Sequence, residues 1–117
     1  MWFCNNDGFI SAVADSSDPT GNTLKVRARF RRDLEDIFPD KEIVEDAGTD
    51  YKYRVFITKQ ELAEIMYERI LNIDYTNFKN SVARNDLHDL YEQFWWAGYN
   101  MQGKSSKPNY RMYRNAK

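Results

Sequence analysis

The single cysteine and the single histidine are the first residues to consider for catalysis. A cysteine nucleophile needs a base beside it, and only His88 could serve Cys4. His88 follows an expected helix start by three residues, which favours a solvent-facing position, whereas a free cysteine is commonly a small buried apolar residue. We therefore expect Cys4 in the core and no dyad. A lone cysteine excludes an intramolecular disulfide, fits a reducing compartment, and with one histidine argues against a structural metal.

Acidic side chains are plentiful, but their spacing defines no acid–base pair. Such chemistry needs two carboxyl groups held about 5–9 Å apart in a cleft. Asp33 and Asp36 lie near the start of a predicted helix, where the helix dipole favours anions without any function. The glycines are scattered, so no phosphate-cradling loop is predicted. We expect no cofactor and no enzymatic activity.

Two features favour a protein interface. Trp96 falls outside the apolar stripe of the last predicted helix, and exposed Trp and Tyr are typical interface anchors, so Trp96 and Tyr99 are the interface candidates. The alternative is that the C-terminal tail covers Trp96. The segment 33–50 is rich in acids, with only Lys41 as a base, and could imitate a nucleic-acid backbone; such a run is more often a solvated face. The acidic candidates are Asp33, Glu35, Asp36, Glu45 and Asp46.

Basic residues gather in two places that could bind nucleic acid. Residues 24–30 alternate, so Lys25, Arg27 and Arg29 share one face, beside Arg54 if the two strands are neighbours. The alternative is a solvated face whose charges pair with acids on neighbouring strands. The C-terminal residues supply cations without any acid, either as a disordered end or as a strand packed on the body. These tail candidates are Lys104, Lys107, Arg111 and Arg114.

The hydrophobic pattern predicts the elements that position these side chains. Strands are expected at 1–4, 9–14, 24–30, 41–45 and 51–57, with a hairpin turn at Asp7-Gly8 and with Tyr51 among the apolar residues of the last strand. A helix over 31–38 ends at Pro39. Residues 58–61 read as a capping box for a helix whose apolar stripe runs from Leu62 to Ile73.

A short helical link is expected at 78–83. Asn85 is then expected to cap a last helix, which ends near Gly98 or Gly103. The buried face of this helix is predicted to carry Leu87, Leu90, Tyr91, Phe94 and Trp95.

These elements predict a single α+β domain. We expect an antiparallel sheet of about five strands with two or three helices packed on one face, a ferredoxin-like variant. Residues 1–102 would form the compact domain and residues 103–117 a basic, tyrosine-containing tail. No signal peptide or membrane helix is visible, so a soluble, cytoplasmic protein is expected.

Five segments carry a resemblance: GFISAVAD (8–15), LKVRAR (24–29), DLEDIFP (33–39), DYKYRV (50–55) and IDYTNFK (73–79). Together they resemble an uncharacterised family of short hypothetical proteins from bacteria and their phages. The resemblance covers most of residues 1–95 and implies a bacterial or phage setting, but no functional residue is carried over because the family has no established activity.

Together these features favour a small non-enzymatic protein-binding module. By analogy with phage proteins, it would be a phage-linked inhibitor that occludes a component of a bacterial defence or host system, of the anti-CRISPR-like class. The partner would be another protein or a second copy of the chain, with no membrane involved. The alternative is a nucleic-acid-binding protein that uses the basic sheet face and the tail. Either would act in the cytoplasm of a bacterium or an infected host.

Overall fold

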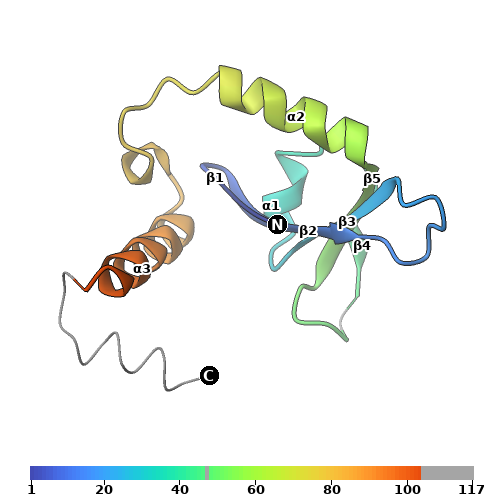
Figure 1. Cartoon of the computed structure of the whole chain (residues 1–117), viewed down its shortest axis with the longest axis horizontal. Coiled ribbons are helices and arrows are strands. Elements are labelled where there is room, and N and C mark those ends of the chain that lie inside the picture. Colours follow the sequence, from blue (N-terminus) through green and yellow to red (C-terminus); the bar gives the residue numbers. More distant parts are fainter. Residues whose placement is uncertain (47, 104–117) are drawn as a thin grey trace.

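The chain folds into an open antiparallel sheet with helices against it (Figure 1). The computed structural model describes residues 1–46 and 48–103. The sheet order is β1-β2-β3-β5-β4, and every neighbouring pair is antiparallel. This α+β architecture confirms the predicted fold class and is consistent with a ferredoxin-like variant. The elements are β1 (Trp2–Asn5), β2 (Gly8–Ala14), β3 (Thr23–Ala28), α1 (Arg32–Glu35), β4 (Val44–Glu45), β5 (Tyr53–Thr58), α2 (Lys59–Leu71), the 3-10 turn η1 (Lys79–Ser81) and α3 (Asn85–Met101).

The first hairpin forms where it was predicted, but its glycine has a different role. Asn5 pairs with Gly8, so Asn6 and Asp7 make the turn, and the φ of Gly8 is not positive. A Cβ at Gly8 would lie only 2.6 Å from the main-chain oxygen of Asp33 in α1. Glycine is needed here because α1 approaches the strand closely. The prediction that Gly8 is a turn residue was therefore wrong.

The main core lies between one face of the sheet and the helices α1 and α2. The alternation read in the sequence puts Val26 of β3 and Val55 of β5 on this face, where both are fully buried. Leu34 of α1 and Leu62 of α2 cover them. The buried cluster is Ile10, Ala12, Val26, Ala28, Leu34, Ile37, Phe38, Val55, Ile57 and Leu62.

The start of α2 is fixed by the predicted capping box. The Thr58 hydroxyl accepts a hydrogen bond from the Glu61 main-chain N–H at 3.1 Å, and the Glu61 carboxylate accepts one from the Thr58 N–H at 3.2 Å. Two main-chain donors that the first turn would leave unpaired are therefore satisfied.

Replacing Thr58 with alanine is expected to lower the free energy of unfolding by about 1 kcal/mol, because the helix loses the acceptor for its first turn. Thr58→Ser keeps the hydroxyl and is the matched control, with little expected change. Urea denaturation of both variants measures the difference. An equal loss in the serine variant would show that the threonine methyl group, and not the cap, stabilises the helix.

The second half of α2 departs from the predicted stripe. Leu62 is buried and Ile65 and Met66 are half-buried, but Ile70 and the following Ile73 are exposed. A cleft of about 410 Å³ lies between the last turns of α2 and strand β1, so these side chains do not reach the sheet. The prediction of a buried stripe along the whole helix was therefore wrong at its C-terminal end.

Helix α3 packs against the opposite face of the sheet, at its β1–β2 end. Phe9 alternates with Ile10 and therefore points away from the main core, into a second cluster with Leu87 and Tyr91 of α3. The Tyr91 hydroxyl donates a hydrogen bond to the main-chain oxygen of Asn5 at 2.7 Å. The remainder of this second face, over β3 and β5, carries no helix among the described residues.

Candidate functional site

The C-terminal half of α3 carries a patch of exposed aromatic side chains. Trp95 and Trp96 retain 47% and 49% of their accessible surface. Their ring centroids lie 4.9 Å apart, and Tyr99 stacks on Trp95 at 5.1 Å and meets Trp96 edge-on at 5.7 Å. The Lys79 ammonium lies over Trp95, 4.6 Å from the ring centroid. We call Trp95, Trp96 and Tyr99 the α3 aromatic patch.

The patch agrees only partly with the sequence interpretation. Trp96 was expected outside the buried stripe and is half-exposed, and Tyr99 lies beside it, as an interface requires. Trp95 was expected in the core. It is exposed. Aromatic contact between α3 and the sheet runs as far as Phe94, whose ring lies 5.6 Å from Phe9 and 6.1 Å from Trp2, whereas the ring contacts of Trp95 among the described residues are with Trp96 and Tyr99 of its own helix. The sequence pattern could not show where contact with the sheet ends.

The acidic interface candidates do not form one surface. Asp33 is 3% exposed and bonds to Arg84, so it is not available to a partner, which corrects its assignment. Glu45 and Asp46 lie within 3.8 and 4.0 Å of Lys52 and Arg54 and are partly neutralised by them. The other two acidic candidates are exposed at α1 and carry no resolved ion pair within the described ranges: Glu35 and Asp36.

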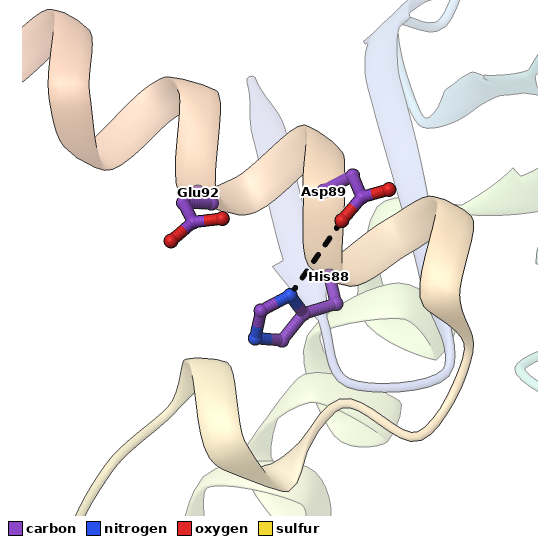
Figure 2. A group of neighbouring side chains, drawn as sticks. All are labelled: His88, Asp89 and Glu92. Carbon is purple, nitrogen blue, oxygen red and sulfur yellow. Dashed lines mark ion pairs between the residues drawn. The ribbon is translucent and has the colours of Figure 1, made fainter.

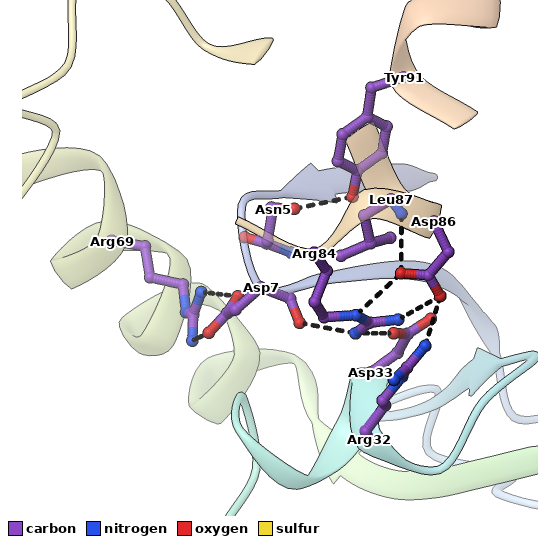
Figure 3. Close-up of polar contacts among 9 residues, drawn as sticks. All are labelled: Asn5, Asp7, Arg32, Asp33, Arg69, Arg84, Asp86, Leu87 and Tyr91. Carbon is purple, nitrogen blue, oxygen red and sulfur yellow. Dashed lines mark hydrogen bonds and ion pairs between the residues drawn. The ribbon is translucent and has the colours of Figure 1, made fainter. Parts of the chain in front are cut away.

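Asp33 belongs to an ion-pair network that joins α1 to α3 (Figure 3). The Arg84 guanidinium donates hydrogen bonds to Asp33 at 2.5 Å, to Asp86 at 3.1 Å and to the main-chain oxygen of Asp7 at 3.3 Å. Burial raises the pKa of the Asp33 carboxyl, and the hydrogen bond from Arg84 opposes that shift. The bonds from Arg84 lower the pKa of Asp86 to about 2. These shifts arise from a structural tie between elements.

The same network explains how α3 begins. Asn85 was predicted to be the cap, but it is the first helical residue, and no side chain caps the helix. Arg84 holds the cap position and directs its guanidinium to Asp33 instead. On the other side of the hairpin turn, Asp7 accepts two hydrogen bonds from Arg69 of α2, at 2.7 and 3.0 Å. The turn is thus tied to α1, α2 and α3.

The predicted basic candidates do gather on the open second face. Arg27 of β3 lies directly opposite Arg54 of β5, and Lys25 lies opposite the exposed Phe56. Arg54 approaches Asp46 at 4.0 Å, as the solvated-face alternative requires. Among residues 1–46 and 48–103, however, no ion pair involves Lys25, Arg27 or Arg29. The tail candidates Lys104, Lys107, Arg111 and Arg114 lie outside the described residues.

Tyr51 is the functional candidate that the sequence interpretation placed wrongly. It was assigned to the apolar side of a strand 51–57, but β5 begins only at Tyr53. Tyr51 is buried against the second face, where the guanidinium carbons of Arg27 and Arg29 lie 4.7 and 4.3 Å from its ring centroid. The bend before β5 breaks the alternation, and no local signal marks that bend.

Cys4 and His88 are not joined by any hydrogen bond in the described part of the chain. Cys4 is exposed on the edge strand β1, which corrects its core assignment, and partial burial raises the pKa of its thiol, the opposite of what a nucleophile needs. His88 Nδ1 instead lies 3.9 Å from Asp89 of its own helix.

A group of three potential metal ligands lies on α3 (Figure 2). The donor atoms of His88, Asp89 and Glu92 all lie within 4.8 Å of one another. A zinc ion bound at about 2.0–2.2 Å would require any two of them within about 4.2 Å, so the side chains would have to rotate. Asp89 is exposed, and no second feature of the described residues points to an ion here.

Comparisons with known proteins identify no relative: no family model, no curated protein and no solved structure matches the chain. The resemblance to short phage and bacterial proteins therefore stays a prediction. Within the residues that the structure describes, no helix has the length and apolar character that a membrane crossing requires.

Proposed function

We propose that this protein is a non-enzymatic binding module whose α3 aromatic patch occludes a surface of a protein partner. The observation that carries the proposal is the cluster of Trp95, Trp96 and Tyr99, in mutual contact yet about half-exposed for both tryptophans. Trp and Tyr are the residues most enriched among interface hot spots. A contiguous aromatic patch of this kind is uncommon on the surface of a protein without a partner.

The packing within the patch supports binding rather than mere exposure. Trp95 contacts both the Tyr99 ring, at 5.1 Å, and the Lys79 ammonium, at 4.6 Å. Rings that are already held lose little rotamer freedom when a partner covers them, so more of the contact energy contributes to affinity. Because the acidic run is dispersed and partly neutralised, the aromatic rings, and not the acids, would supply most of that affinity.

Trp96→Ala is expected to weaken partner binding at least about tenfold, because truncating an aromatic anchor removes buried contact area. The matched control is Tyr67→Ala, which removes an exposed ring from α2, away from the patch. A photo-crosslinking residue placed at position 96, and separately at 67, would identify the partner. Calorimetry with the purified partner then measures both variants.

Thermal unfolding separates binding from folding. The midpoint of Trp96→Ala should stay close to that of the natural protein, since surface substitutions change stability by about 0.5 kcal/mol or less. A large loss of stability would show that Trp96 is part of the core. If Trp96→Ala and Tyr67→Ala bind the partner with equal affinity, the partner does not bind at the α3 aromatic patch. Light scattering, which would report a dimer that Trp96→Ala dissociates, distinguishes a second copy from another protein.

A further inference from the structure

A row of side chains crosses the open second face of the sheet. The strand register places Trp2 opposite Ser11, Ser11 opposite Arg27, and Arg27 opposite Arg54. Like charges directly opposite each other on neighbouring strands are destabilising. Arg27 donates a hydrogen bond to the Ser11 hydroxyl at 3.0 Å, which orients the guanidinium but does not neutralise it. Arg54 approaches Asp46 at 4.0 Å, whereas no ion pair among the described residues involves Arg27, so an anion bound beside Arg27 would reduce this repulsion.

Tyr51 contacts two of the arginines. The guanidinium carbons of Arg27 and Arg29 lie 4.7 and 4.3 Å from the centroid of its ring. Arg29 is exposed, and within the described ranges no ion pair involves its guanidinium. Planar guanidinium groups with unused donors match the oxygens of a phosphate, which they bind in a bidentate manner.

An apolar groove of about 370 Å³ borders this arginine cluster. Arg29 belongs to both, since it stacks on Tyr51 and also lines the groove. Trp2 and Phe30, which retain 63% and 53% of their accessible surface, form part of the lining. The other aromatic and aliphatic lining residues are Phe9, Leu87, Leu90 and Phe94.

We propose that this face binds a nucleoside phosphate, free or as a unit of single-stranded nucleic acid, with the base in the aromatic groove and the phosphate on Arg27 and Arg29. A bare inorganic anion would use only the arginines. A ligand that spans both halves needs a planar, largely apolar ring one sugar away from a phosphate, which is the composition of a nucleotide. The site is independent of the α3 aromatic patch, so either proposal can fail alone.

Fluorescence anisotropy with a labelled oligothymidylate and the full-length chain tests the site. We expect binding that weakens as salt rises, because phosphate contacts release counterions. A strand of the same length with abasic sugars carries the same phosphates without bases. It should bind at least about fivefold more weakly, since base–aromatic stacking is lost. Competition by thymidine monophosphate distinguishes a free nucleotide from a site that needs a strand.

Matched variants separate the sheet face from the basic tail, which remains in every sample. Arg29→Gln should weaken oligothymidylate binding severalfold, whereas Arg31→Gln removes the same charge from an exposed position without a resolved side-chain contact and should not. Trp2→Ala should abolish the preference for the strand with bases over the abasic strand. Equal effects of the two arginine variants, or no preference for bases, would overturn the proposal. Binding of a phosphotyrosine peptide in place of the oligonucleotide would also overturn it.

Discussion

Replacing Arg84 with methionine is expected to lower the free energy of unfolding by about 3–5 kcal/mol, a large part of the stability of a domain this size. The Asp33 carboxylate is only 4% exposed, and Arg84 is its ion-pair partner. Without the guanidinium, the buried Asp33 carboxyl must either remain charged without its hydrogen-bond donor or take up a proton. Urea denaturation at neutral pH measures the loss. Arg32→Met is the control, since its ion pair with Asp86 is exposed and should contribute little.

The pH dependence of the Arg84 variant identifies the cause. Burial already raises the pKa of Asp33, and loss of Arg84 should raise it further. A carboxyl whose pKa is higher in the folded protein than in the unfolded chain destabilises the fold as pH rises above about 4. The loss in the free energy of unfolding caused by Arg84→Met should therefore become smaller as the pH is lowered toward 4. Adding Asp33→Asn to the same chain should restore part of the lost stability at neutral pH. A loss of stability that does not change with pH would instead indicate that the packing of the arginine side chain is what the variant lacks.

Gly8→Ala is expected to destabilise the protein by about 3 kcal/mol, the upper end of the usual cost of overpacking. The new Cβ would lie 2.6 Å from the main-chain oxygen of Asp33 and 3.0 Å from its Cα. Both are backbone atoms of α1, so neither can move aside by a side-chain rotation. The α1 backbone would have to move to make room, and this movement would also disturb the hydrogen bond between Asp33 and Arg84.

Gly98→Ala is the matched control for this substitution. Gly98 lies within α3, and a Cβ there would meet nothing within 4 Å. Alanine should therefore stabilise the helix by about 0.5–1 kcal/mol. The thermal midpoints of the two variants are expected to move in opposite directions. If Gly8→Ala is tolerated, the close approach of α1 to β2 does not occur in solution.

The local patterns of the sequence determined the elements and most of the main core. Alternation at 24–30 identified β3, with Val26 and Ala28 inward, because a pleated strand points successive side chains to opposite faces. The Thr58–Glu61 capping box located the start of α2 because it depends on residues within one turn. Such features involve only near neighbours in the chain, so the order of residues is enough to predict them.

The tertiary structure alone decided which surfaces are available. Asp33 is buried under Arg84, 51 residues away. Tyr51 packs against Arg27 of β3 and against Arg29, just after that strand. No local periodicity encodes such pairings between distant segments. Trp95 has the spacing of a buried residue but is exposed, because the aromatic contacts of α3 with the sheet reach Phe94 and do not include Trp95. Hydrophobic spacing shows which side of an element is apolar. Whether another element covers that side depends on how far each helix extends along the sheet.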